Sequence, residues 1–439
     1  MKKISIVAVM ALIVSRIAAA DFLITDFGAK SGMDNLNTVS IQKAIDECAK
    51  KGGGRVIVPK GKFLTGALQL KSGVTLYLEK KATLYGSTNP KDYVLNKNSG
   101  KIITAQLLFA AGAKNIGIAG PGIIDGQGAA FNDKACNAVG ITRPMLIRFD
   151  TCRDILISDV TLRNSGVWME HYFACENLTI KNVKIYNHCN NCNDGMDIDC
   201  CKNVTISGVT VDSDDDGICL KSTALKSCEN INVSNCTISS HCNAMKIGTE
   251  TLGGFKNITF SNCNVRPSKN KNVVNGRANG ISAISIESVD GAAVENVLFT
   301  NITVKGTEAP IFVRLGNRGS TYGQKVTGIR RGSIKGITIQ NLNVKNAGST
   351  GCSITGIPGQ KVENVHLSNI TIKQDGGMQK VAAPVDNKEK AYPEATMWGT
   401  LPATGFFVKN AKNVSFDNVR VFTRSKDGRP SLYKVDVEE

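Results

Sequence analysis

One phrase of alternating apolar and polar residues recurs along most of this chain, each time with an asparagine or aspartate at its third position. Examples are CRDILISDVTLRN, CENLTIKNVKIYN, CKNVTISGVTVDS and CENINVSNCTISS. The third-position residues, here called anchors, are Asp154, Asn177, Asn203, Asn230, Asn257, Asn296, Asn364 and Asn413, with weaker copies at Asn115 and Gly336. The first four spacings are 23, 26, 27 and 27 residues. This repeat limits the possible folds more than any other feature.

Alternation with a period of two, rich in valine, isoleucine and threonine, indicates strands with one buried face. A repeat of this length is too short for a pair of helices or a propeller blade. Because one coil cannot bury its apolar face alone, successive coils must stack and pair their strands in parallel around one core. The sequence therefore predicts an all-β solenoid that forms a single domain over residues 21–439.

The 14 cysteines follow the same repeat. Four of them lie two residues before an anchor, namely Cys152, Cys175, Cys201 and Cys228, and another stacked position is shared by Cys236 and Cys263. This spacing predicts a buried ladder of small apolar side chains rather than a disulfide framework. Cys189 and Cys192 form a separate C-x2-C pair. We expect a local disulfide or free thiols there in preference to a metal site, because no second pair stands at zinc-ribbon spacing.

The first 20 residues, MKKISIVAVMALIVSRIAAA, combine lysines, an apolar run and small residues as a signal peptide does, which predicts export to the periplasm or the cell exterior. No other segment is apolar over a length that could span a bilayer. The net charge of +16 becomes +13 when the three leader cations are removed, and such an excess favours an anionic partner. Scattered cations and only 6% aromatic residues argue against nucleic acid, so acidic polysaccharide is the first candidate and a solvated basic face the alternative.

Two stretches interrupt the repeat and are predicted to be loops over the solenoid. Residues 264–280 are basic and rich in glycine and asparagine, and residues 374–405 lengthen one repeat to 49 residues. Long loops in compact folds are often functional. The second loop contains Trp398, for which stacking on a sugar and packing within the loop are both open.

The densest acidic stretch is NNCNDGMDIDCCKNVTISGVTVDSDDDGICLKS. Asp194 and Asp215 are 21 residues apart in it, close to one coil, so both should project from the same face beside Asp216. Hydrolysis of a glycosidic bond needs a protonated carboxyl and a carboxylate that activates water, and crowding of acids raises the pKa of one of them. The sequence therefore predicts a catalytic site at these three aspartates, with a calcium site or a solvated turn as the alternative.

These motifs resemble the polygalacturonases, family 28 of the glycoside hydrolases. The similarity begins at ITDFGAKSG, continues through NSGVWMEHYFACENLTI and is most specific at NDGMDID and SDDDGICLKS. The resemblance implies a right-handed single-stranded parallel β-helix of the pectin-lyase type and an inverting hydrolase of galacturonate linkages, and we expect no metal and no cofactor. It implies Asp215 as the general acid and Asp194 with Asp216 as holders of the attacking water. Inversion predicts carboxyl groups about 6.5 to 9.5 Å apart.

Two motifs depart from those of the family. The Gly-His-Gly motif is replaced by SHCNAMKIGTE, in which His241 is the nearest counterpart and a candidate catalytic residue. The Arg-Ile-Lys motif that binds the substrate carboxylate is replaced by Ser285-Ile286-Glu287. The expected activity is therefore that of a polygalacturonase, an exo-acting galacturonidase or a rhamnogalacturonan hydrolase. The candidate substrate-binding residues are Lys246, Arg277, Arg314 and Trp398.

The expected partner is acidic plant cell-wall polysaccharide, such as pectin, galacturonan or rhamnogalacturonan, and the expected state is a monomer. Two other functions stay open. One is a calcium-dependent eliminase like the pectate lyases, which share the solenoid. The other is a β-helix protein that binds polysaccharide without catalysis.

Overall fold

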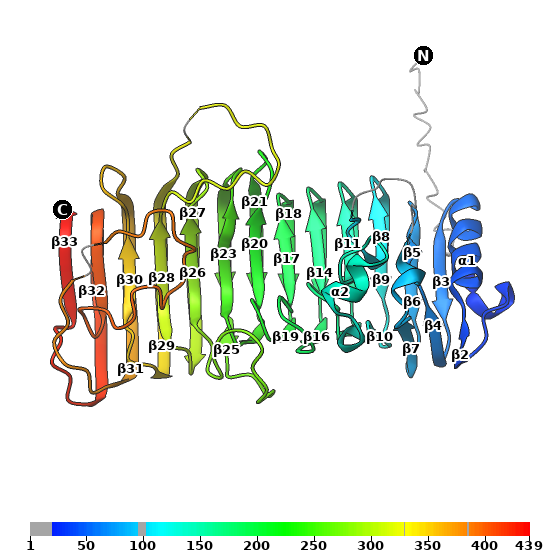
Figure 1. Cartoon of the computed structure of the whole chain (residues 1–439), viewed down its shortest axis with the longest axis horizontal. Helices are drawn as coiled ribbons and strands as arrows, with labels where there is room; N and C mark the ends of the chain where they lie inside the picture. The colour runs from blue at the N-terminus through cyan, green and yellow to red at the C-terminus, as the bar shows by residue number, and fades with distance from the viewer. Residues whose placement is uncertain (1–19, 95–101, 329, 384–385) are drawn as a thin grey trace, which may run out of the picture.

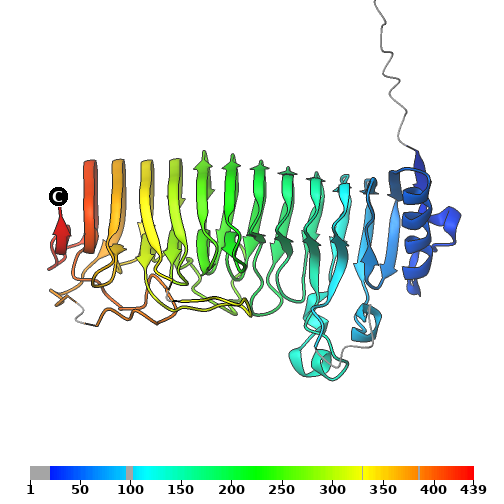
Figure 2. The ribbon, with the colours of Figure 1, turned by 90° about the horizontal axis from the view of Figure 1, so that it is seen from above.

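The computed structural model describes residues 20–94, 102–328, 330–383 and 386–439. They form one elongated solenoid with helix α1 (Thr38–Lys50) at its N-terminal end (Figures 1 and 2). The predicted parallel β-helix is confirmed. Residues 1–19 of the predicted signal peptide lie outside the described residues. Within the described part of the chain, no helix is long and apolar enough to cross a membrane.

Three sheets run along the solenoid, and their strands pair in parallel from coil to coil. The first, here called the site sheet, contains β5 (Leu68–Gln69), β8 (Gln106–Ala111), β11 (Met145–Asp150), β14 (Glu170–Phe173), β17 (Met196–Asp199), β20 (Ile218–Ser222), β23 (Asn243–Thr251), β26 (Ser282–Ser288), β28 (Ala309–Leu315), β30 (Cys352–Thr355), the start of β32 (Phe406–Ser425) and β33 (Leu432–Glu438). The second contains β1 (Asp21–Leu23), β3 (Gly54–Val58), β6 (Val74–Leu78), β9 (Lys114–Ala119), β12 (Arg153–Ser158), β15 (Glu176–Lys181), β18 (Lys202–Ser207), β21 (Cys228–Ser234), β24 (Phe255–Ser261), β27 (Ala293–Lys305), β29 (Ser333–Ala347) and β31 (Val362–Gly376). The third contains β2 (Gly32–Leu36), β4 (Gly61–Thr65), β7 (Ala82–Gly86), β10 (Ile123–Asp125), β13 (Thr161–Arg163), β16 (Lys184–Asn187), β19 (Thr210–Ser213), β22 (Thr237–Ser240) and β25 (Asn264–Val265), and it continues through the later parts of β27, β29, β31 and β32.

The anchors turn the chain at the start of each second-sheet strand. Asp154 and Asn177 have φ angles of 58° and 56°, in the left-handed region that asparagine and aspartate enter more readily than most residues. Their side chains also bond from coil to coil, because Asn177 donates to Asp154 over 2.8 Å and Asn203 donates to Asn177 over 3.2 Å. The anchors therefore form a hydrogen-bonded ladder that fixes the spacing between successive coils.

The predicted cysteine ladder is confirmed. Cys152, Cys175, Cys201 and Cys228 are buried in the core, and the backbone N–H of Cys175 donates to the Cys201 sulfur over 3.4 Å. All 14 cysteines are free thiols. Of the two alternatives for the C-x2-C pair, free thiols are therefore found, and burial raises the pKa of Cys189 to about 12.

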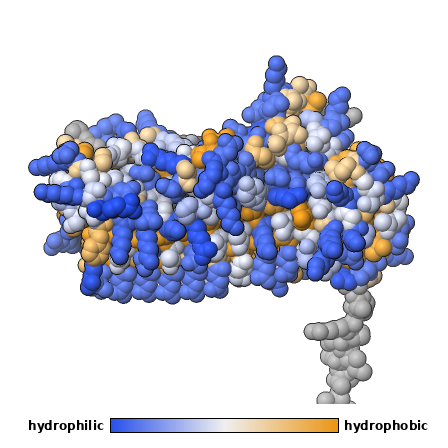
Figure 3. Space-filling view, turned by 90° about the horizontal axis from the view of Figure 1, so that it is seen from below, coloured by the Kyte–Doolittle hydropathy of each residue, from blue (hydrophilic) through white to orange (hydrophobic). Residues whose placement is uncertain are grey.

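Both predicted loops are present, with shifted bounds. Residues 266–281 connect β25 to β26, and residues 377–405 connect β31 to β32. The 377–405 loop projects from the same side as helix α2 (Asp133–Asn137) (Figure 2). The neighbouring face of the solenoid, seen from below Figure 1, is mainly hydrophilic (Figure 3). Two further long connections, residues 126–144 and 316–332, were not predicted from the repeat. The 40-residue step between Asn296 and Gly336 was the available signal for the second of these.

The short helices among the described residues are α2 and three 3-10 turns, at η1 (Ile24–Phe27), η2 (Pro90–Tyr93) and η3 (Gly128–Ala130). Helix α1 buries Ile41, Ala44, Ile45 and Cys48 against the first coil. It closes the N-terminal end of the core, where the first strands would otherwise expose their apolar residues to water.

Candidate active site

The site sheet places alternate residues inside and outside the solenoid. In β17, Met196 and Ile198 enter the core, whereas Asp197 and Asp199 face outward. The same alternation runs through the next coils, so that Asp197 stacks on Cys219 and Cys219 stacks on Lys246. Charged side chains that are distant in sequence therefore share one outer face.

The three predicted catalytic aspartates come together on this face. Asp194 lies two residues before β17, and Asp215 and Asp216 lie just before β20. Carboxylate oxygens of the three residues all lie within 4.8 Å of one another. This spacing is tighter than the 6.5 to 9.5 Å expected for carboxyl groups of an inverting enzyme, so that expectation is wrong for the nearest oxygens. The reason is structural, because neighbouring parallel strands lie about 4.8 Å apart.

Asp216 is held by donors on both of its oxygens. Its Oδ2 accepts from Lys246 Nζ over 2.9 Å, and its Oδ1 accepts from Asn243 Nδ2 over 2.9 Å. The backbone N–H of Asn243 adds a third hydrogen bond of 3.2 Å to Oδ1. Charge-assisted bonds of this kind stabilise an ionised carboxylate.

Asp215 and Asp194 are in a different electrostatic state. Burial, followed by the charge of Asp216, raises the pKa of Asp215, although this side chain is only half-buried. Burial, followed by the charges of Asp197 and Asp215, raises the pKa of Asp194 well above its usual value. The cluster can therefore keep a proton on Asp194 or Asp215 while Asp216 stays paired with Lys246.

Lys221 is a second buried cation in the site, which the sequence analysis did not identify. Its Nζ lies 2.9 Å from Glu250, 3.4 Å from Asp197 and 3.8 Å from Asp194. Although burial opposes the shift, Lys221 lowers the pKa of Glu250 to about 2. The ammonium also lies 4.8 Å from the ring centre of the partly exposed Trp168. Lys221 follows the acidic run by five residues, and this closeness was a signal in the sequence. Its partners, however, come from other coils.

His241 does not lie with the three aspartates in the way expected of a catalytic residue. Its ring is fully buried, with Nδ1 2.8 Å from Asp214 Oδ1 and Nε2 3.3 Å from the carbonyl of Asn270. Both ring nitrogens are thus engaged by the coil and by the 266–281 loop. The structure assigns His241 to the support of the site and not to contact with substrate.

Arg314 and Trp398 also differ from their predicted roles in substrate binding. Arg314 is only 1% exposed, and it donates to the carbonyls of Gly356 and Asn387 over 3.3 and 2.5 Å. Its guanidinium lies 5.1 Å from the ring centre of Trp398. The two side chains hold the 377–405 loop against the site sheet, which leaves the guanidinium buried away from a ligand.

The other two predicted cations lie closer to the site. Lys246 is paired with Asp216 and lies 3.4 Å from the hydroxyl of Tyr392 in the 377–405 loop. Arg277, in the 266–281 loop, has a half-exposed side chain that contacts Glu308 over 3.3 Å. Of the four predicted substrate-binding residues, Arg277 is therefore the one with an accessible cationic group.

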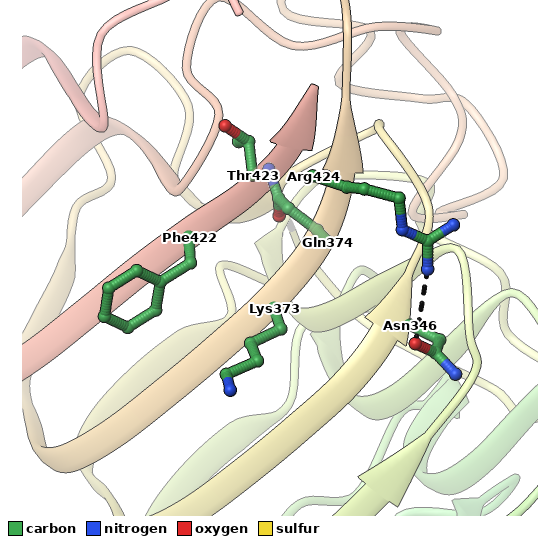
Figure 4. Close-up of a pocket in the computed structure, with 6 residues that line it drawn as sticks. All are labelled: Asn346, Lys373, Gln374, Phe422, Thr423 and Arg424. Atoms are coloured by element: carbon green, nitrogen blue, oxygen red, sulfur yellow. Dashed lines mark hydrogen bonds between the residues drawn. The ribbon is translucent and has the colours of Figure 1, made fainter. Parts of the chain in front are cut away.

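A separate pocket lies at the ends of β29, β31 and β32, far along the chain from the aspartates (Figure 4). It is lined by Asn346, Lys373, Gln374, Phe422, Thr423 and Arg424. Arg424 contacts Asn346 over 3.4 Å and Asp375 over 3.2 Å. Its lining holds cations but no acid–base pair of carboxyl groups, so it is not the candidate active site.

Glu170, at the start of β14, gives the first testable prediction. It is fully buried, and neither carboxylate oxygen has a hydrogen-bond partner among the described residues. Burial, followed by Asp197, raises its pKa from 4.5 to about 8. Between pH 4.5 and about 8, Glu170 keeps a proton in the folded state that it releases in the unfolded chain. The free energy of unfolding therefore falls as the pH rises through this range.

We expect Glu170→Leu to raise the melting temperature at pH 8 by on the order of 5 °C and to have less effect at pH 4.5. The register supports this choice, because Glu170 pairs with the core residue Ile147. The measurement is thermal unfolding at both pH values, with Glu176→Leu on the surface of β15 as the control. An unchanged pH dependence in Glu170→Leu would show that this carboxyl is not the group responsible.

Comparison with known proteins supports one family. Residues 48–391 match the glycosyl hydrolases family 28. A probable polygalacturonase of Vitis vinifera is 33% identical over 214 residues, which are 45% of this chain and 44% of the relative. An exo-poly-α-D-galacturonosidase of Dickeya chrysanthemi is 42% identical over 142 residues, which are 30% of this chain and 23% of the relative. The matched region thus spans less than half the length of these two curated relatives.

Among solved structures, a hyperthermoactive exopolygalacturonase of Thermotoga maritima has a similar fold. Its TM-score is 0.72 at 21% sequence identity, and the match covers 92% of each chain. At this identity the likeness concerns the fold alone. The extent of the family match, which includes the three aspartates and both buried lysines, shows that the chain belongs to family 28 of the glycosyl hydrolases.

Proposed function

We propose that this protein hydrolyses galacturonate linkages in pectin, with Asp194, Asp215 and Asp216 as the catalytic residues. One observation carries the proposal: three carboxyl groups within 4.8 Å of one another combine a lysine-paired aspartate with two whose pKa values are raised. Such a set supplies both a proton donor and a carboxylate at the same pH. Relatives described as polygalacturonase and exo-poly-α-D-galacturonosidase support the substrate class.

The roles follow from the surroundings of each aspartate. Asp215 is half-buried and can reach a ligand, so it donates its proton to the glycosidic oxygen as the bond to the anomeric carbon breaks. Asp216, ionised beside Lys246, accepts a proton from the attacking water, and Asp194 holds that water from the preceding coil. Lys246 is a positioning residue in this scheme, because it fixes the charge and direction of Asp216 and does not itself contact substrate.

Recognition of the uronate carboxylate is proposed to rest on Arg277, which was predicted from the sequence, and on Lys221, which was not. Lys221 lies beside Asp194 and the ring of Trp168, an arrangement suited to a sugar that carries an acid. Arg277 offers a half-exposed guanidinium on the 266–281 loop. With Arg314 held inside the 377–405 loop, these two residues are the proposed contacts for acidic groups.

The 377–405 loop favours action at a chain end. Residues that face outward from β26 and β28 are buried beneath it, as Glu287 and Phe312 show with 1% exposure each. Ala395 of the loop packs with Phe312, and the ring centre of Tyr392 lies 5.6 Å from the Lys246 ammonium. A polysaccharide cannot run along the covered part of the site sheet, so we propose exo action. Export to the periplasm or cell exterior and a monomeric state complete the proposal.

Stereochemistry tests the proposed mechanism. We expect digestion of galacturonan oligosaccharides to release monomer with inverted anomeric configuration, because Asp194 and Asp216 place water opposite Asp215. NMR of the nascent product, before mutarotation, measures the configuration. Retention would overturn the water-based mechanism. The measurement is needed because the close spacing of the carboxyl groups resembles that of retaining enzymes.

The same digestion distinguishes the other functions. An eliminase would give an unsaturated product that absorbs ultraviolet light and would lose activity with a chelator. A binding protein would release no reducing sugar at all. Rhamnogalacturonan oligosaccharides tested in parallel identify the linkage, and accumulation of monomer without intermediate oligosaccharides identifies exo action.

A further inference from the structure

A second cluster of titratable groups lies beside the three aspartates but takes no part in the proposed mechanism. His188, Asp214 and His241 come from three successive coils, and one side-chain atom of each lies within 4.8 Å of the others. All three residues are buried. Their ligand types, two imidazoles and one carboxylate, are those that bind divalent transition metals in proteins.

The outer nitrogen of each imidazole has an acceptor. His188 Nε2 lies 2.9 Å from Asp212 Oδ1, and His241 Nε2 lies 3.3 Å from the carbonyl oxygen of Asn270. A carbonyl only accepts, so His241 carries a proton on Nε2. Asp212 also accepts from the Ser268 hydroxyl over 2.6 Å and from the Lys269 N–H over 3.1 Å, which keeps it ionised and places a proton on His188 Nε2.

The inner nitrogens, which both lie near Asp214 Oδ1, therefore carry lone pairs when the rings are neutral. His241 Nδ1 lies 2.8 Å from Asp214 Oδ1, a contact that needs a proton or a cation between the two atoms. His188 Nδ1 lies 3.8 Å from the same oxygen, too far for a hydrogen bond, and no described residue forms a hydrogen bond with it. The side chain of His188 is only 1% exposed, so water does not satisfy this atom from the surface.

We propose that His188 Nδ1, Asp214 Oδ1 and His241 Nδ1 bind a divalent transition-metal ion, with zinc as the first candidate. The outer contacts match those of metal-bound histidines, whose second nitrogen donates to a carboxylate or carbonyl. The carboxylate is supported in the same way, because Asp214 also accepts the N–H groups of Val274 and Asn275 over 3.0 and 2.7 Å. One Zn²⁺ balances the charges of Asp212 and Asp214. The sequence analysis expected no metal, and it named His241 only as a candidate catalytic residue.

The site fastens the 266–281 loop to the coil that bears the catalytic aspartates. This loop supplies the outer contacts of Asp212, Asp214 and His241, and Asn275 also donates to Asp215 over 2.9 Å. The loop passes so close that a Cβ on Gly276 would lie 2.0 Å from the carbonyl oxygen of His241. The metal is therefore structural, and it orients the half-buried Asp215 indirectly.

Zinc binding can be tested on the whole protein without an activity assay. The protein is stripped with a chelator, dialysed and titrated with ZnCl₂ in competition with a colorimetric zinc dye. We expect one Zn²⁺ per chain with a dissociation constant below about 1 μM, and a rise in melting temperature of several degrees at saturating zinc. Titration with CoCl₂ should give the visible absorption of a site of low coordination number.

Two variants and one control locate the binding. His188→Asn and His241→Asn should each weaken zinc binding by at least about 10-fold to 100-fold, whereas His366→Asn, at an exposed histidine beside Ser415, should bind zinc as the wild type does. If a variant does not fold, ¹⁵N NMR of the wild-type imidazoles decides the question, because zinc should shift both Nδ1 resonances. No saturable binding, unchanged binding in His188→Asn, or imidazoles that stay doubly protonated in zinc would overturn the proposal.

Discussion

Asp215→Asn is expected to lower the rate of galacturonan hydrolysis by about 10²-fold to 10⁴-fold, the contribution of a general acid. The amide has the shape of the carboxyl group but cannot donate a proton to the leaving oxygen at neutral pH. Because burial and the charge of Asp216 raise the pKa of Asp215, the folded protein does not depend on its negative charge. The melting temperature should therefore stay at or above that of the wild type.

Reducing-sugar release and thermal unfolding measure the two parts of this expectation. Asp46→Asn in helix α1 is the matched control, since it removes a carboxyl group at the N-terminal end of the solenoid. The control should keep wild-type activity. Activity of Asp215→Asn within a factor of about three of the wild type would exclude Asp215 as the acid, while the fold and family would be unaffected.

Lys221→Met is expected to lower the free energy of unfolding by about 3 to 5 kcal/mol at pH 7, the cost of leaving buried charges without their partner. The lysine is 5% exposed and lies within 4 Å of Glu250, Asp197 and Asp194. Without it, these carboxyl groups must either stay ionised in a buried place or take up protons. Activity should fall as well, because Asp194 loses its nearest cation.

Guanidinium unfolding at several pH values measures this effect. Loss of the lysine raises the pKa values of its carboxyl partners in the folded state, so the deficit in stability should shrink as pH falls from 7 toward 5. Lys202→Met, which breaks an exposed pair with Glu229, is the control and should cost no more than about 1 kcal/mol. Adding Glu250→Gln to Lys221→Met should restore part of the stability. Equal stability of Lys221→Met and the wild type would refute the role of this cation.

The repeat made most of the fold predictable, because one residue pattern sets the strands, the turns and the height of each coil. Asn177 and Asn203 could be placed on one ladder from their spacing, and Cys175 and Cys201 on another. The gathering of Asp194 with Asp215 followed from the same spacing. Features that depend only on the spacing between coils could therefore be predicted from the sequence.

The rest depended on loops whose paths no repeat determines. Arg314 has the chemistry of a substrate contact, but the 377–405 loop covers it and takes its donors. His241 is likewise closed in by Asn270 of the 266–281 loop. Lys221 was missed for a related reason, since its partner Glu250 belongs to the following coil beyond an irregularity in the strand pairing.

The cysteine ladder has a consequence for how this chain must reach its native state. Twelve of the 14 thiols are buried in the folded solenoid and cannot meet an oxidant there. In the unfolded chain every one of them is exposed, and any disulfide formed early would join coils that must still stack. If the protein is exported as proposed, its thiols can oxidise before the coils have stacked. A reductant should therefore raise the yield of native protein on refolding.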